Sequence, residues 1–225
     1  MKEQWRAEIK YILSMADSRM LAARLATFMH RDTHGDRDGY RVRSLYFDNF
    51  YHKALREKLD GIGIRDKFRI RCYDGKFDFI RLEKKSKRYS AGHKYQCRLT
   101  EEETMRMILG DTSWMVEDER ALIRELYLRM TMGVYRPQMI VDYAREAFTY
   151  APGNVRITFD RDICGCDQPE LFFCRQLPIV PALPRDRVVM EVKYDDFLPD
   201  IIHRTLLTVK QKEQAFSKFA ACYLR

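Results

Sequence analysis

No stretch of this 225-residue chain stays apolar for the roughly 20 residues that a membrane-spanning helix requires, so the sequence predicts no membrane span. No signal peptide is recognisable at its beginning, and we therefore expect a cytoplasmic protein. The chain also lacks internal repeats, low-complexity tracts and Gly/Ser linkers. Because 46% of its residues are hydrophobic and 12% are aromatic, it can bury a full core, and we predict one domain over residues 1–225.

Clustered metal or nucleophile motifs are also missing. The six cysteines are spaced irregularly in a chain too long to need disulfides, which favours reduced thiols. Cys164 and Cys166 lie close together, with Cys174 nearby, but the second Cys/His pair of a structural zinc site is absent. The five histidines are scattered, so a histidine-based catalytic centre is not predicted.

Positive charge is what the chain has in excess. Lysine and arginine total 41 against 33 for aspartate and glutamate, which gives a formal net charge of +8. The isoelectric point of about 9.2 favours an anionic partner. The excess alone does not identify the anion.

Helical spacing of apolar residues predicts several surface helices. One begins at Asp17 or Ser18, and a capping box formed by Thr100 and Glu103 begins another. Further helices are expected over residues 119–132 and, as a pair, from about residue 199 onward.

Between these helices, about eight segments alternate polar and apolar residues with the period of a β-strand. In residues 64–73, Arg65, Lys67, Arg69 and Arg71 share one face, and the opposite face is largely apolar. A similar alternation, with Arg, Lys or an acidic residue on the polar face, occurs in residues 6–13, 44–48, 79–87, 93–99, 139–147, 155–163 and 188–194.

Eight amphipathic strands suit a barrel whose interior holds side chains or one slim ligand. If the apolar faces pack beneath the helices, the charged faces line a lumen, and so many cations require water and a polyanion there. A sheet with its polar face in water is the ordinary alternative, but Arg or Lys recurs on nearly every strand. We therefore predict an α+β fold, a closed antiparallel eight-stranded tunnel β-barrel with helices packed on its outside.

Short motifs spread over nearly the whole chain give it a family resemblance. In order they are EIKY, SLYFD, RIRCY, LEKK, YAREAF, VRITFD, MEVKY and FSKF. Together they resemble the VTC-type polyphosphate polymerase domain of the triphosphate tunnel metalloenzyme superfamily, including its bacterial relatives. The resemblance implies a tunnel in which basic side chains hold triphosphate or polyphosphate and acidic side chains hold Mn²⁺ or Mg²⁺.

The resemblance also implies roles for individual residues. Catalytic phosphate ligands would be Lys10, Arg69, Arg71, Lys85, Arg145, Arg156 and Lys218. Further substrate contacts would come from Lys94, Tyr143, Lys193 and Ser217. The metal would be held by Glu191, with Glu8 and Glu83 as candidates to assist it. These residue types suit the task, because arginine binds phosphate through a planar fork and carboxylate oxygens suit hard divalent cations.

The leading functional prediction is metal-dependent phosphoryl transfer, specifically ATP-dependent polyphosphate synthesis. No nucleophilic triad is required, because the protein mainly positions phosphates and neutralises charge. An inorganic tripolyphosphatase or nucleoside triphosphatase is the alternative enzyme. An inactive polyphosphate sensor is a third reading, because vacuolar family members have a lysine where this chain has Ala215.

Other partners follow from the same features. A nucleic-acid-binding module is disfavoured, because the basic residues alternate within strands and are mixed with glutamates. The expected ligands are therefore ATP, triphosphate or polyphosphate. A membrane protein that exports the polymer is a candidate partner.

Overall fold

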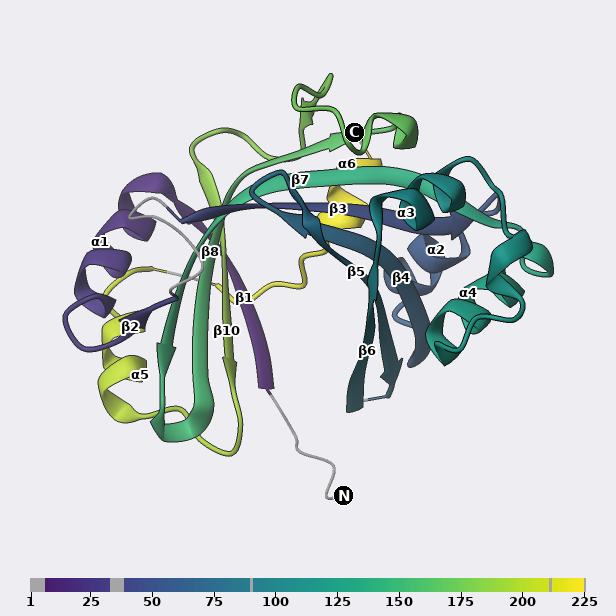
Figure 1. The fold of residues 1–225 in the computed structure, drawn as a ribbon. Helices are drawn as coiled ribbons and strands as arrows, with labels where there is room; N and C mark the ends of the chain where they lie inside the picture. The colour runs from purple at the N-terminus through teal and green to yellow at the C-terminus, as the bar shows by residue number, and fades with distance from the viewer. Residues whose placement is uncertain (1–6, 33–38, 90, 211, 225) are drawn as a thin grey trace. The chain divides into compact units, whose positions relative to one another are not determined.

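The computed structural model describes residues 7–32, 39–89, 91–210 and 212–224 (Figure 1). Its helices are α1 (Met15–Leu25), α2 (Lys53–Leu59), α3 (Glu101–Ile108), α4 (Ala121–Thr131), α5 (Asp200–Leu206) and α6 (Lys218–Tyr223). Its strands are β1 (Ala7–Ser14), β2 (His30–Arg31), β3 (Tyr40–Asn49), β4 (Ile64–Tyr73), β5 (Lys76–Arg88), β6 (Ala91–Leu99), β7 (Tyr135–Tyr150), β8 (Val155–Cys166), β9 (Val180–Pro181) and β10 (Arg187–Tyr194).

Hydrogen bonds order the strands as β1-β10-β8-β7-β3-β4-β5-β6, with β2 beside β7 and β9 beside β8. The β1–β10, β10–β8, β3–β4, β4–β5 and β5–β6 pairs are antiparallel. The eight strands of this path correspond to the eight amphipathic segments of the sequence, although residue 6 lies outside the described residues. The α+β class is confirmed, and closure of the strands into a tunnel remains a prediction.

The chain divides into two compact units. Unit 1 comprises Met1–Arg41, Tyr143–Ile163 and Leu183–Ser217. Unit 2 comprises Val42–Asp142, Cys164–Ala182 and Lys218–Arg225. Each unit has its own apolar core, and the single domain over residues 1–225 stays a prediction.

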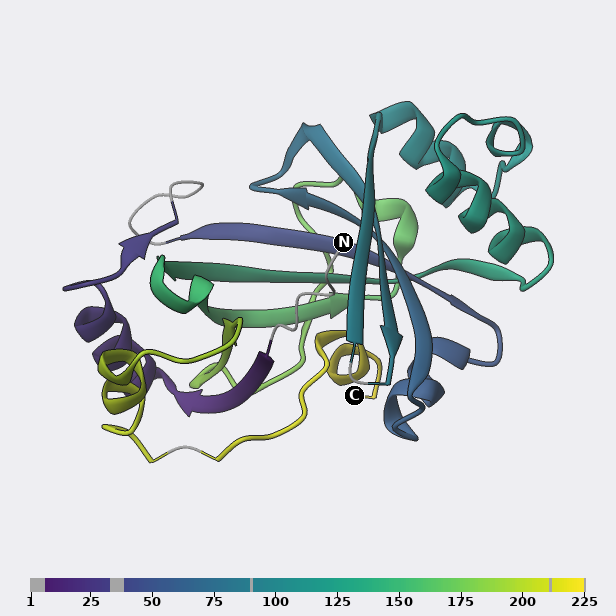
Figure 2. The same cartoon turned by 90° about the horizontal axis from the view of Figure 1, so that it is seen from below.

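In unit 1, helices α1 and α5 pack together over the apolar faces of β1, β8 and β10 (Figure 1). The view from below shows the two helices side by side (Figure 2). Ile157 and Val192 are buried among residues such as Leu21, Leu25 and Ile202. Burial of each such aliphatic side chain contributes about 1.5–3 kcal/mol to the free energy of folding. This burial keeps the helices packed on the apolar face of the strands.

Unit 2 repeats this arrangement with helices α3 and α4 on β5 and β6. Phe68 and Ile70 are fully buried, in one cluster with Met107, Leu126 and Met130. The alternate residues of 64–73 that were expected to be apolar therefore lie on the face of the sheet that the helices cover. Lys67, Arg69 and Arg71 alternate with these residues and lie on the opposite face. Asp66 and Lys84 are charged residues on the covered face, where they pair with Arg129 and Glu125 of α4.

One of the two helix starts expected from the sequence is found in the structure, and the other is not. Thr100 and Glu103 form the expected capping box of α3, in which each side chain accepts from the backbone amide of the other residue. The expected start of α1 at Asp17 or Ser18 was wrong, because β1 runs directly into the helix and Ser14 is the N-cap, accepting from the Asp17 amide at 3.0 Å. Ser18 instead donates to the carbonyl of Met15.

No helix in the described part of the chain is both long and apolar enough to cross a membrane.

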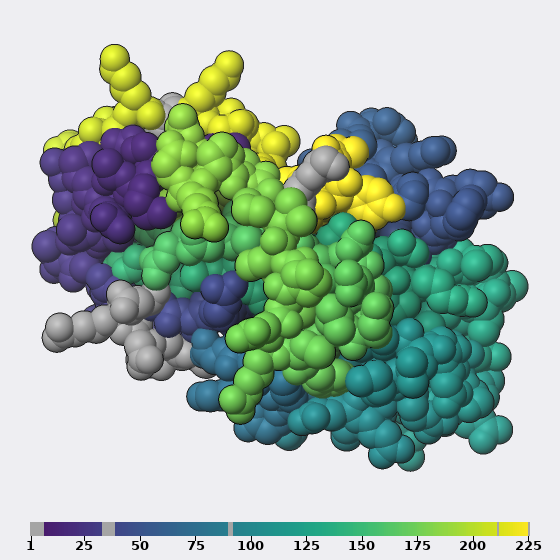
Figure 3. All heavy atoms as spheres, turned by 90° about the horizontal axis from the view of Figure 1, so that it is seen from above, coloured from purple at the N-terminus to yellow at the C-terminus, as the bar shows by residue number. Residues whose placement is uncertain are grey.

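The segment that follows β8 in unit 2 lies on the surface, in green in the view from above (Figure 3). Ile179 and Val180 in this segment are about half exposed, and Val180 begins the short strand β9.

Helix α2 was not anticipated from the sequence, because it has only seven residues and buries only Ala54 and Leu55. Asp48, at the end of β3, explains it. The Asp48 carboxylate is fully buried and accepts from the backbone amides of Ala54 at 2.8 Å and Leu55 at 3.1 Å. A buried anion at these free amides satisfies the first turn and stabilises the helix.

We predict that Asp48→Ala lowers the free energy of unfolding by about 3 kcal/mol, because it leaves two buried amides without acceptors. The control is Asn49→Ala, which removes an exposed acceptor from the Lys53 amide and should cost less than about 1 kcal/mol. Urea unfolding followed by circular dichroism measures both. Equal losses in the two variants would contradict the role of Asp48.

Candidate functional site

The polar face of unit 2 carries two rows of cations. In each row the residues are direct partners across antiparallel strands β4, β5 and β6. One row is Lys67, Lys85 and Lys94, and the other is Arg71, Arg81 and Arg98. Like charges directly opposite one another destabilise a sheet, so this arrangement requires compensating negative charge.

Glu83 lies between the two rows and supplies part of that charge. Its side chain is 1% exposed. Its Oε2 lies 2.6 Å from Nη2 of Arg69 and 3.9 Å from Nη1 of Arg71, and its Oε1 lies 2.5 Å from Nζ of Lys94. Burial raises the pKa of Glu83, but Arg69, Arg71 and Lys94 outweigh burial and lower that pKa to about 2. The carboxylate therefore stays ionised and orients three predicted phosphate ligands.

Tyr46 of β3 joins the group of polar side chains around Arg69. Nη1 of Arg69 donates to its hydroxyl at 3.0 Å, and its ring stacks on Phe219 of α6 with centroids 5.0 Å apart. Burial raises the pKa of Tyr46, but the charges of Arg69, Arg71 and Lys218 outweigh burial and lower that pKa to about 8. The charges of Arg69, Arg71 and Lys218 thus act on the same hydroxyl group.

Unit 1 holds a closed square of four charges, Glu8, Lys10, Glu191 and Lys193, which we call the charge square. Lys10 Nζ lies 2.9 Å from Glu8 and 3.5 Å from Glu191. Lys193 Nζ lies 3.5 Å from Glu8 and 2.5 Å from Glu191. Glu191 is the most buried of the four. Both carboxylates are therefore neutralised by the two predicted phosphate ligands.

The C-terminal segment of unit 1 runs beside β1 and touches the charge square. The Gln214 amide donates to the Lys10 carbonyl at 3.0 Å, and Lys10 Nζ donates to the Phe216 carbonyl at 3.2 Å. Ser217 follows directly and is half-buried. Burial lowers the pKa of Lys10, but Glu191 and Glu8 outweigh burial and raise it, so the ammonium stays charged. Ala215, which departs from the family lysine, is exposed.

Two further predicted ligands of unit 1 are held by aspartates. Arg145 donates from Nε at 2.6 Å and from Nη2 at 2.8 Å to the two oxygens of the fully buried Asp160. Burial lowers the pKa of Arg145, but the Asp160 carboxylate outweighs burial and raises it well above its usual value. The guanidinium lies 5.3 Å from the ring centre of the buried Tyr143.

Arg156 is held in a similar way. It donates from Nη2 to Asp32 at 2.8 Å and to the Tyr40 hydroxyl at 3.1 Å. Bidentate and multiply bonded guanidinium groups are fixed in orientation, which suits groups that receive a ligand.

The predicted site residues therefore fall into two sets, one in each unit. Those of unit 1 are Glu8, Lys10, Tyr143, Arg145, Arg156, Glu191, Lys193 and Ser217. Those of unit 2 are Arg69, Arg71, Glu83, Lys85, Lys94 and Lys218. Sequence reasoning missed Tyr46, Arg81, Arg98 and Asp160 as members of these sets. All four occupy positions on the polar face of their strands, and this alternation is the sequence feature that could have identified them.

A preassembled metal centre is not seen in the described residues, where no three His, Cys, Asp or Glu side chains cluster. Glu8 and Glu191 share two lysines and so lie on the same small polar surface. Two carboxylates that share such a surface fit Mg²⁺ or Mn²⁺, which typically bind through one or two carboxylates together with substrate phosphates. Glu83 is bound to three cations, which fits a metal ligand less well.

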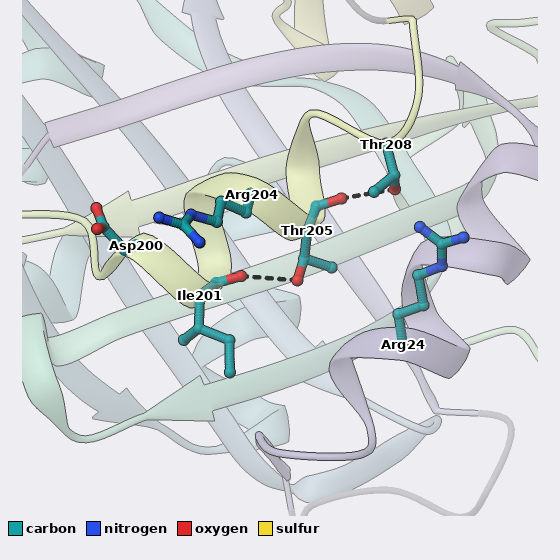
Figure 4. A pocket seen from close by; sticks show the side chains of 6 residues that line it. All are labelled: Arg24, Asp200, Ile201, Arg204, Thr205 and Thr208. Atoms are coloured by element: carbon teal, nitrogen blue, oxygen red, sulfur yellow. Dashed lines mark hydrogen bonds between the residues drawn. The ribbon is translucent and has the colours of Figure 1, made fainter.

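A cavity of about 530 Å³ lies elsewhere in unit 1, between α1 and α5. Arg24 and Arg204 line it, together with Thr205 and Thr208 (Figure 4). The two threonine hydroxyls donate to backbone carbonyls of their own helical segment. This cavity contains none of the predicted site residues.

Solved structures with similar folds are known. A Hippeastrum protein described as a candidate adenylyl cyclase with a dominant triphosphatase activity has a TM-score of 0.57 at 14% identity, over 96% of this chain and 94% of that one. A Bacillus halodurans protein described as a candidate adenylate cyclase has a TM-score of 0.52 at 10% identity, over 92% and 87%. The Schizosaccharomyces pombe Mediator head module gives 0.50 at 6% identity, over 90% of each chain.

These identities show a shared fold only. No curated protein matches the chain. The family comparison is decisive, because the VTC domain matches residues 5–225, nearly the whole sequence. The resemblance read from the sequence motifs is thereby confirmed, and the chain belongs to the VTC domain family.

Proposed function

We propose that the protein is a metal-dependent phosphoryl-transfer enzyme that binds triphosphate or polyphosphate and makes polyphosphate from ATP. The observation that carries the proposal is the pair of cation rows in unit 2, Lys67-Lys85-Lys94 and Arg71-Arg81-Arg98. A row of directly opposed cations is unfavourable by itself. A linear chain of phosphates, with one or more charges on each unit, is the kind of ligand that neutralises such rows.

The arginines of unit 2 are oriented in advance. Glu83 holds Arg69 on one side and Lys94 on the other, so these cations keep their geometry when no ligand is present. Preorganised cations stabilise charge on transferring phosphates without reorganisation. We assign Glu83 to this positioning task in preference to metal binding.

The charge square of unit 1 supports a site for both metal and phosphate. Lys10 and Lys193 now neutralise Glu8 and Glu191. When phosphates take the two ammonium groups, the two carboxylates become available to a divalent cation. Glu8 and Glu191 would hold Mn²⁺ or Mg²⁺, which would supply positive charge to neutralise the charge that develops during transfer. Arg145, fixed by Asp160, and Arg156, fixed by Asp32, would bind further phosphate oxygens.

The finer features belong to the same proposal. We propose that the strands close into an eight-stranded tunnel. Tyr143 and Ser217 of unit 1 and Lys218 of unit 2 are proposed as further phosphate ligands. Mn²⁺ or Mg²⁺ as the metal, a cytoplasmic location and a membrane-protein partner are likewise proposed. A salt bridge of Glu191 with Lys193, the structural alternative to metal binding, is present at 2.5 Å, so metal binding must displace it.

A triphosphatase is the second candidate. It is favoured by the fold shared with the Hippeastrum protein, whose description names a dominant triphosphatase activity. Ala215 also favours it, because the lysine of the vacuolar members is missing beside Phe216, whose carbonyl binds Lys10. An inactive sensor would share the ligand but not the turnover.

Incubation of the pure protein with ATP and MnCl₂, followed by separate assays for long polyphosphate and free phosphate, tests the proposal. We expect polyphosphate to accumulate and to disappear when a chelator removes the metal. Release of phosphate without polymer would establish the triphosphatase. Binding of tripolyphosphate without any turnover would establish the sensor.

The pair Arg69→Ala and Arg71→Ala should weaken tripolyphosphate binding by several kcal/mol, because each charged hydrogen bond contributes about 1.5–3 kcal/mol. The matched control is Arg24→Ala with Arg204→Ala, which removes equal charge from the cavity of unit 1 and should change little. Calorimetry with tripolyphosphate, and competition with RNA of equal charge, measure the effect.

Removal of Arg69 and Arg71 leaves Glu83 buried with fewer partners, so the same pair is also made in a Glu83→Gln background. There the carboxylate is neutral, and any remaining loss of affinity reports lost ligand contacts. If the double variant loses RNA binding and keeps tripolyphosphate binding, the protein is a nucleic-acid module.

Glu191→Gln should abolish turnover and leave tripolyphosphate binding largely intact, because the amide keeps the shape of the side chain and loses the charge that attracts the metal. Asp186→Asn is the control, since the Asp186 side chain is 68% exposed. Steady-state rates over a range of MnCl₂ concentrations provide the measurement. Activity with unchanged metal dependence in Glu191→Gln would remove Glu191 from the metal site.

A further inference from the structure

Thr158 stands out on the polar face of β8. The residues two positions before and after it have ionic partners, since Arg156 binds Asp32 and Asp160 binds Arg145. The Thr158 side chain is 4% exposed, and its hydroxyl has no hydrogen-bond partner among the described residues. Buried hydroxyls are nearly always hydrogen-bonded in proteins, so this group requires an explanation.

The strand register places Thr158 beside the charge square. Glu191 of β10 is the direct partner of Lys10 on one side and of Thr158 on the other. Direct partners in an antiparallel pair point to the same face with Cβ atoms about 4.5–5.5 Å apart. The Thr158 hydroxyl therefore adjoins the Glu191 side chain, whose carboxylate is now drawn to Lys10 and Lys193.

Packing alone does not account for this hydroxyl. Valine has the same β-branched shape, suits a strand equally well and would leave no buried polar atom unsatisfied. The hydroxyl therefore costs stability in the ligand-free protein, and a gain in another state would explain why it is there.

We propose that Thr158 is a positioning residue for Glu191, and that its hydroxyl donates a hydrogen bond to the Glu191 carboxylate when phosphates draw Lys10 and Lys193 away. The inference rests on the function proposed above for Glu191. A hydroxyl is suited to this task because it fixes a carboxylate without neutralising it. The full negative charge then remains for a divalent cation, whereas a lysine partner cancels it. Groups that orient a metal ligand in this way typically change metal affinity 10–100-fold when they are removed.

The test compares Thr158→Val, which removes the hydroxyl, with Thr158→Ser, which keeps it. Calorimetry measures Mn²⁺ affinity in the presence of inorganic tripolyphosphate. We expect a loss of about tenfold for valine and a change within about twofold for serine. Tripolyphosphate affinity in the presence of a chelator should be unchanged in both variants. The thermal unfolding midpoint of the ligand-free valine variant should equal or exceed that of the parent, because valine removes the unsatisfied hydroxyl.

Unchanged Mn²⁺ affinity in Thr158→Val, or equal losses in the valine and serine variants, would overturn the inference. Glu191→Gln in the same assay distinguishes a failure of the metal role of Glu191 from a failure of the positioning role of Thr158. If Glu191→Gln weakens Mn²⁺ binding and Thr158→Val does not, only the role of Thr158 fails. If Glu191→Gln leaves Mn²⁺ binding unchanged, the metal role of Glu191 fails and the inference fails with it.

Discussion

Neutralisation of closely spaced cations by buried carboxylates is the constraint on which the polar faces of both units depend. In unit 2, Glu83 binds two arginines and a lysine. In unit 1, Asp160 binds both nitrogens of one guanidinium edge, and Glu191 binds two lysines. Without these anions, the repulsion between directly opposed cations such as Lys85 and Lys94 would be uncompensated, and strand pairing would weaken.

Such ion pairs are poor devices for stability alone. Removing charged groups from water costs several kcal/mol each, and apolar residues of similar size often stabilise a fold equally well or better. The apolar faces of the same strands, covered by α1, α5, α3 and α4, already supply the cores. This cost favours the ligand-binding role proposed for the charges. Glu83 and Asp160 are almost inaccessible and act as fixed supports, whereas Lys10 and Lys193 remain partly exposed and can exchange partners.

Sequence periodicity predicted which side chains share a face, because alternation with period two is a local property of a strand. It therefore placed Arg69, Arg71 and Glu191 on polar faces and Phe68 and Ile70 beneath helices. It could not predict which residues lie opposite each other, since register depends on hairpins and irregularities such as the shift between Arg71 and Tyr73.

The features that were missed depend on distant residues. Helix α2 is too short to show a helical pattern, and its first turn is stabilised by Asp48 of another element. The cation rows, the contact of Tyr46 with Arg69 and the orphan hydroxyl of Thr158 follow from register and burial. A short stretch of sequence does not contain that information. The eight amphipathic segments could be identified without it, because each is defined by its own alternation.

The contact of Lys10 with the Phe216 carbonyl joins residues 206 positions apart. A ribosome delivers β1 long before β10 and residues 213–216, so the strand must wait for both before its polar groups find their partners. Closing so long a loop makes this pairing non-local and slow relative to helix formation. A nascent chain consequently has no assembled charge square until residue 193 has left the ribosome, and Lys10 gains its contact with the Phe216 carbonyl only after residue 216 has followed.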